Sequence, residues 1–225
     1  MLNQRHLNGH EVTIKKQDLI AGDVLMCYKN DKDSELAFNT TGSKYAHVAI
    51  YLGENNIAEA IPSGIKKTSI DVLIRMYDHL AVLRQELFQH RELVQKMKYF
   101  IDQLIKNNTI FDDKGIDEKV FIEKQSAYQD NMHKLIIDYF EGKMPEVSPH
   151  SSKYFCSQLI AAIFIYTGII VQGATFIYNP EQISPANIND ATFGSFIGYL
   201  VKRSEYNIPE NDDFYNELMD IEITE

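Results

Sequence analysis

The sequence predicts an α+β fold in which an antiparallel sheet packs on one apolar helix. Segments with the composition of β-strands, joined by tight turns, lie between residues 23 and 85, and helical periodicity begins at residue 91. Blocks of strands followed by blocks of helices are typical of α+β folds, whereas strict alternation indicates a parallel sheet. With 225 residues, 44% of them hydrophobic, the chain can bury one large core, and we expect a single domain over residues 1–225.

The strand segments are short runs bounded by turn residues. Gly22-Asp23 precedes the first run, the turn GENN joins the second to the third, and Pro62-Ser63-Gly64 closes the third. The expected strands are 23–29 (DVLMCYK), 46–53 (AHVAIYLG), 57–61 (IAEAI) and 79–85 (HLAVLRQ). Cys27 lies inside the first of these strands, where we expect a buried core thiol.

Three segments have helical character. The first, 91–108, places apolar residues at helical spacing and ends at an Asn-Asn pair, and the second covers 131–142. We interpret about 91–142 as a helical insertion into a core of about 19–200, and we expect this insertion to line or cover the cleft. The third segment, KYFCSQLIAAIFIYTG at 153–168, is mostly apolar and ends at Gly168, a residue suited to a left-handed C-cap.

Cys156 lies in or beside the first turn of this third helix, for which Ser151 and Ser152 are the expected N-caps. The positive end of a helix is where a thiol most easily loses its proton. The ordinary alternative is a small buried hydrophobe, since free cysteine is among the most buried residue types.

Charge and composition exclude several classes of function. The formal net charge of −10 disfavours binding to nucleic acids or to anionic membrane surfaces. No run of 18 apolar residues indicates a transmembrane helix, and the N-terminus has no apolar signal region. The two cysteines do not suggest a disulfide framework, so we expect a cytoplasmic protein with free thiols. The acidic segment 204–225 is expected to be a solvated tail, part of which can dock as a short helix through its apolar residues.

His47 and Glu59 lie on adjacent expected strands. Alternation along 46–53 puts His47 on the face opposite Val48 and Ile50, which we expect to face the core. If a three-residue loop pairs Leu52 with Asn56, His47 and Glu59 are diagonal neighbours on one face. A two- or four-residue loop would put them on opposite faces. Separately, each residue has an ordinary explanation, as a surface histidine and an exposed edge carboxylate.

Together, Cys156, His47 and Glu59 have the chemistry of a nucleophile, a base and an acceptor that orients the base. The backbone N–H of Cys156 would face the oxyanion of the reaction. Tyr154 and Tyr45 each precede one of these residues by two positions; they can donate to the oxyanion, line the cleft or simply pack in the core. His79 is a weaker candidate base, because no expected neighbouring strand offers it a carboxylate.

The sequence contains no HExxH or CxxC pattern and no GxGxxG or P-loop, so we predict neither a metal nor a cofactor.

The ordered set HVAIYLG, IAEA and YFCSQLI resembles the circularly permuted NlpC/P60 family of papain-like cysteine hydrolases. LIAGDVLM and ISPANI resemble further stretches of that family, and the similarity spans roughly Leu19 to Leu200. In the permuted branch the histidine comes first, then an acidic residue, then the cysteine, as His47, Glu59 and Cys156 do here. The resemblance implies a papain-like core in which the sheet packs on the cysteine helix.

The resemblance also implies an activity: cleavage of an amide or related acyl bond through a Cys-His-Glu triad and an acyl-enzyme. A small peptide, a muropeptide or an acyl-amide is then the expected substrate. Related permuted proteins resemble lecithin:retinol acyltransferases, so an acyltransferase, lipid amidase or thioesterase is the alternative. A non-catalytic binding module is the second alternative, and it predicts that Cys156 is out of reach of His47.

Overall fold

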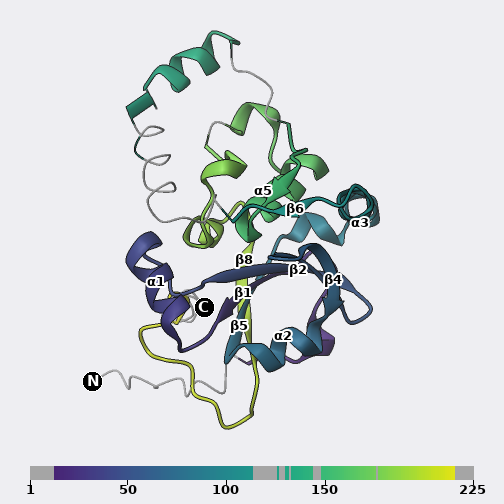
Figure 1. The fold of residues 1–225 in the computed structure, drawn as a ribbon, viewed down its shortest axis with the longest axis vertical. Coiled ribbons are helices and arrows are strands. Elements are labelled where there is room, and N and C mark those ends of the chain that lie inside the picture. Colours follow the sequence, from purple (N-terminus) through teal and green to yellow (C-terminus); the bar gives the residue numbers. More distant parts are fainter. Residues whose placement is uncertain are drawn as a thin grey trace, which may run out of the picture.

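The computed structural model describes residues 13–113, 126, 130–131, 133–143, 148–175 and 177–215. Its centre is a six-stranded antiparallel sheet with the strand order β4-β3-β2-β1-β5-β8. The strands are β1 (Val24–Tyr28), β2 (His47–Gly53), β3 (Asn56–Ile61), β4 (Gly64–Ser69), β5 (His79–Arg84) and β8 (Ser195–Val201). The antiparallel sheet and the mixed α+β class agree with the prediction (Figure 1).

The helices lie around this sheet. They are α1 (Lys32–Thr41), α2 (Ile70–Met76), α3 (Arg91–Lys106) and α5 (Cys156–Thr167). Residues 133–140 are also helical, within the second predicted helix. The 3-10 turns are η1 (Lys16–Asp18), η2 (Glu86–Gln89), η3 (Gln172–Ala174), η4 (Pro180–Gln182) and η5 (Pro185–Asn189), and β6 (Ile110–Phe111) pairs in parallel with β7 (Lys153–Tyr154).

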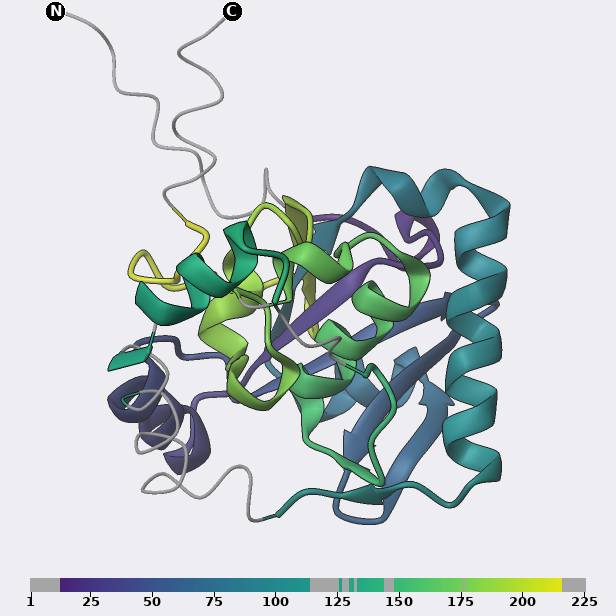
Figure 2. The ribbon, with the colours of Figure 1, turned by 90° about the horizontal axis from the view of Figure 1, so that it is seen from above.

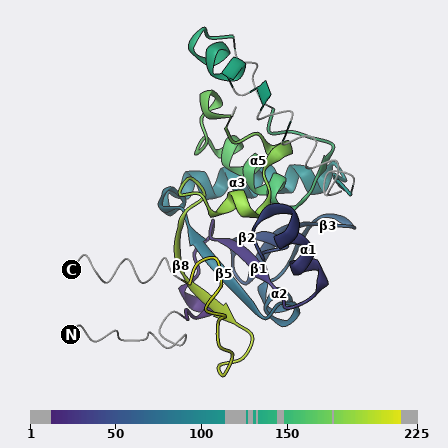
Figure 3. The same cartoon turned by 90° about the vertical axis from the view of Figure 1, so that its left-hand side faces the viewer.

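Helices α5 and α3 cover one face of the sheet, and α2 covers the other (Figures 1 and 3). Eleven of the twelve residues of α5 are buried, so it is the central helix of the larger apolar cluster. Gly168 ends it with a left-handed φ of 84°, as predicted. A residue other than glycine would pay a steric penalty there.

The first helix of the expected insertion belongs to the core. One side of α3 is buried against α5 through Met97, Phe100, Ile101 and Leu104. Figure 2 shows α3 running along the edge of the molecule beside the sheet. The first helix of the predicted insertion 91–142 therefore packs into the core, because its apolar stripe closes this side of the sheet.

Three further expectations need correction. The sheet has two buried faces, since Ala49 and Tyr51 lie in a second apolar cluster beneath α2, so the face that carries His47 is also covered. Ser151 and Ser152 do not cap the cysteine helix: Phe155 is its N-cap residue, because β7 takes up the extended chain in between.

The described part of the acidic tail is solvated only in part: Ser204, Glu205, Asn207, Glu210 and Asn211 are exposed, and the others are buried or half-buried. Residues 204–215 dock on the body through turns, with Ile208 and Phe214 buried. Leu218 and Met219, two further apolar residues of this tail, lie outside the described residues.

Among the described residues, no helix has the length and apolar character needed to cross a membrane.

Candidate active site

The β2–β3 hairpin sets the register on which the site depends. Gly53 pairs with Asn56, so the loop has only two residues, Glu54 and Asn55, both with positive φ (53° and 67°). Such angles are typical of a type I′ turn. The register then shifts between Tyr51 and Gly53, and Ile50 pairs with Ala58.

A two-residue loop was expected to separate His47 from Glu59, and that expectation is wrong. Leu52 is an extra residue on β2 at the shift, and a bulge of one residue reverses the face on which the following side chains lie. The register beyond the bulge is the one in which Ala49 would oppose Glu59 and His47 would lie on its diagonal. The turn and the bulge together therefore bring the two side chains to the same face.

His47 and Glu59 form a largely buried pair. The His47 Nε2 lies 2.9 Å from the Glu59 Oε2, and the two side chains are 13% and 10% exposed. The Thr68 hydroxyl, from β4, donates to the other carboxylate oxygen, Oε1, at 2.7 Å. Burial raises the pKa of Glu59, but the hydrogen bonds from His47 and Thr68 outweigh it, and the net pKa is lowered.

Cys156 is the first residue of α5 and is 8% exposed. The His47 side chain and the backbone N–H groups of Val48 and Ser157 act on this thiol, and each of them lowers its pKa. Glu59 occupies Nε2 of His47, so Nδ1 is the ring nitrogen that this carboxylate leaves unbonded. The backbone pairing between β2 and β3 stops at Ile50 and Ala58. The N–H of Val48 lies beyond this pairing, so it is available to interact with the sulfur.

The electrostatics of this group favour charge separation. Burial raises the pKa of the Cys156 thiol, but the hydrogen bond and charge of His47 and the two backbone N–H groups lower it more, so the net pKa falls below its usual value. Burial lowers the pKa of His47, but hydrogen bonds to Cys156 and Glu59 reverse this and raise it to about 9. A thiolate beside an imidazolium is the state that this arrangement stabilises.

Two residues around His47 come from elements that the sequence did not connect to it. The Tyr77 ring lies parallel to the imidazole, with 5.9 Å between the ring centroids and 9° between the planes. No pattern in the sequence indicates this contact, because Tyr77 lies in the link between α2 and β5. Cys27 pairs with His47 across β1 and β2 and is fully buried, and burial raises its thiol pKa, as a core cysteine requires.

The two tyrosines named in the sequence analysis are bonded elsewhere. The Tyr154 hydroxyl donates to the backbone oxygen of Pro149 and accepts from the Ser151 N–H at 2.8 Å. The Tyr45 hydroxyl donates to Asp212, with O–O distances of 2.9 and 3.0 Å. Both rings are at most 1% exposed, so both fit the packing interpretation.

His79 does have a carboxylate partner, which the sequence analysis did not find. Its Nε2 lies 3.1 Å from Oδ2 of Asp212, and both side chains are at most 1% exposed. Asp212 comes from the docked C-terminal segment rather than from a neighbouring strand, so strand register gave no signal for it. Tyr45 and Tyr199 complete this sealed cluster by donating to the same carboxylate.

Within the described ranges, no group of three histidine, cysteine, aspartate or glutamate side chains has the geometry to hold a metal ion. No family model and no curated protein matches the sequence.

Proposed function

We propose that the chain is a cysteine hydrolase of the peptidase or amidase type, with Cys156 as nucleophile, His47 as acid and base, and Glu59 as the residue that orients His47. The observation that carries this proposal is the buried pair of His47 and Glu59, 2.9 Å apart, together with the first residue of α5, Cys156, which acts electrostatically on the same imidazole. We further propose that the α+β body is a permuted papain-like core and that the protein is cytoplasmic, where its two free cysteines stay reduced.

In the first half of the proposed reaction, the Cys156 thiolate attacks the carbonyl carbon of an amide. A C–S bond forms, and the π electrons of the carbonyl move to oxygen. The N–H groups of the first turn of α5, including that of Cys156, are the proposed donors to this oxyanion. The oxyanion collapses, the C–N bond breaks, and the His47 imidazolium gives its proton to the departing amine.

In the second half, neutral His47 takes a proton from water as that water attacks the thioester carbon. The C–S bond breaks, the acid product leaves, and the thiolate–imidazolium pair is restored. Glu59 stays ionised throughout, keeping the imidazole in one orientation and stabilising its charged form. If an amine or alcohol replaces water in this half, the same site is an acyltransferase.

The proposal is tested by incubating the intact protein with a peptidyl or acyl p-nitrophenyl ester and locating the adduct by mass spectrometry. We expect one acyl group on Cys156 and a burst of p-nitrophenol. Cys156→Ala should abolish both, whereas Cys27→Ala, the matched control, should retain both because Cys27 is fully buried. Absence of a Cys156 adduct, or an adduct only after denaturation, would contradict the proposal. Turnover in water compared with turnover in added amine or alcohol separates the hydrolase from the transferase.

A further inference from the structure

We infer that Tyr77 is a positioning residue of this site, whose ring packs parallel to the His47 imidazole and holds it toward Cys156 and Glu59. The inference rests on the proposed function and adds to it a residue outside the Cys-His-Glu series.

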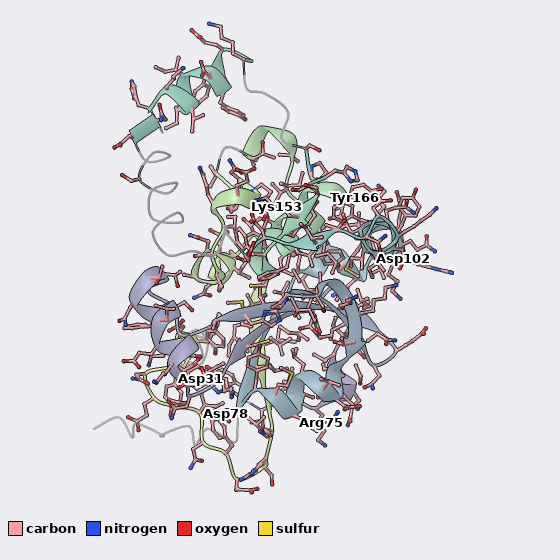
Figure 4. The ribbon with its side chains drawn as sticks, viewed as in Figure 1. Asp31, Arg75, Asp78, Asp102, Lys153 and Tyr166 are labelled. Atoms are coloured by element: carbon pink, nitrogen blue, oxygen red, sulfur yellow. The ribbon has the colours of Figure 1, made fainter. Side chains whose placement is uncertain are left out.

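The backbone at Tyr77 is fixed on both sides. Its N–H donates to the Leu73 carbonyl at 3.1 Å, as the C-cap residue of α2. The next residue, Asp78, donates its N–H to the Tyr28 carbonyl at 2.9 Å and accepts the Asn30 N–H on Oδ2 at 2.9 Å. Figure 4 shows Asp78 close to Asp31, at the end of the sheet where β1 leads into α1. A ring mounted on so constrained a backbone can act as a fixed wall.

The three contacts of the imidazole are complementary. Glu59 binds Nε2 in the plane of the ring, and Cys156 on α5 acts on the same imidazole. Tyr77 instead lies parallel to the ring, in an offset stack. In-plane hydrogen bonds restrain the ring weakly against tilting, whereas a parallel aromatic surface opposes that motion directly. Tyr77 also packs with the second apolar cluster, so it approaches from the α2 side of the sheet, opposite α5.

This placement favours the charged form of His47. An aromatic face attracts a cation that lies within about 6 Å of its centroid, and the two ring centroids are 5.9 Å apart. The titratable groups around the imidazole are Glu59 on β3, Cys156 on α5, Cys27 on β1 and Tyr77 itself. Burial, followed by nearby negative charges, raises the pKa of the Tyr77 hydroxyl, so Tyr77 contributes an uncharged ring.

The test compares Tyr77→Leu with Tyr77→Phe, using the rate of Cys156 acylation by a peptidyl p-nitroanilide as a function of pH, because the departing aniline needs the proton of His47. We expect Tyr77→Leu to reduce this rate at pH 7 about three- to tenfold and to move the alkaline limb of the profile to lower pH, because the imidazolium loses its aromatic neighbour. Tyr77→Phe restores the ring and should recover most of the lost rate. The control is Ile74→Ala, which removes a side chain of the same apolar cluster on α2 and should leave the pH profile in place.

The outcomes separate this inference from the proposed function. If wild-type Cys156 is not acylated, the proposed function fails. If it is acylated and Tyr77→Leu has the wild-type pH profile, the positioning role of Tyr77 is refuted while the hydrolase proposal stands. A Tyr77→Phe variant that loses as much rate as Tyr77→Leu also refutes it, because the phenyl ring retains the stack. Thermal unfolding of each variant shows whether a loss of rate comes from misfolding. If Tyr77→Leu is misfolded, the rate of the folded Tyr77→Phe variant decides whether the positioning role stands.

Discussion

The Nε2 atom of His47 and the Oε2 atom of Glu59 lie 2.9 Å apart. The backbone pairing of their strands, β2 and β3, stops at Ile50 and Ala58, and the contact lies beyond that point. The contact thus lies at the open end of the hairpin, where α5 brings its first residue, Cys156, to the imidazole. A carboxylate this buried costs several kcal/mol unless it is paired, and both oxygens of Glu59 have a partner. The charge of Glu59 is therefore directed at the ring that faces the sulfur.

Glu59→Gln should remove that charge while keeping the shape of the side chain. The pKa of His47 is expected to fall and that of Cys156 to rise, because an opposite charge at contact distance shifts a pKa by about one to three units. Alkylation of Cys156 by iodoacetamide at pH 7 should then slow by about tenfold or more. Thr68→Val removes only the second hydrogen bond of the carboxylate and should have a smaller effect. Equal alkylation rates in wild type and Glu59→Gln would show that the charge does not act on the sulfur.

The pH dependence of acylation should have a plateau with two limits. The lower limit is the Cys156 pKa, which is below its usual value, and the upper limit is the His47 pKa of about 9, above which the leaving amine loses its acid. Because the folded pKa of His47 is raised from 6.5, its contribution to stability is complete below about 6.5 and is lost as the pH rises through about 9. Cys156→Ala removes the sulfur that raises this pKa, so an NMR titration of His47 should give a lower value. An unchanged titration would exclude the ion pair.

The sequence predicted those parts of the molecule that depend on local pattern. The hydrophobic strands predicted at 46–53 and 79–85, the amphipathic stripe of α3 and the glycine after α5 each have a signal within a few residues. The bulge at Leu52 has no such signal. The two-residue turn beside it, Glu54-Asn55, contains no glycine to mark its positive φ angles, so the sequence did not reveal the length of the loop. The contacts made by Tyr77 and Asp212 join segments far apart in the chain, and only the packed structure brings them together.

The turn at Glu54-Asn55 should respond in opposite directions to two substitutions. Glu54→Asn should stabilise the protein by about 0.5–1 kcal/mol, since asparagine tolerates the left-handed conformation better. Asn55→Ala should destabilise it by about 2 kcal/mol, because its amide donates to Ser69 Oγ and Asp71 Oδ2, both at 2.9 Å. Urea unfolding measures both changes. A stabilised Asn55→Ala variant would mean that these hydrogen bonds do not hold the hairpin.

The buried Asp212 should make the protein sensitive to acid. Burial raises its pKa, but the hydrogen bond and charge of His79 and the hydrogen bond from Tyr199 outweigh this, so the net pKa lies below its ordinary 3.8. A carboxyl group whose pKa is lowered by folding stabilises the protein at pH values above its pKa in the unfolded chain, and this stabilisation is lost as the pH falls through its pKa in the folded protein. Asp212→Asn should therefore lower the free energy of unfolding by about 3 kcal/mol at pH 7 and by less near pH 3. Urea unfolding at both pH values measures this difference, and Tyr45→Phe, which removes one donor to the carboxylate, should cost about 1 kcal/mol. A cost of Asp212→Asn that is the same at both pH values would show that the charge on Asp212 does not hold the C-terminal segment against the sheet.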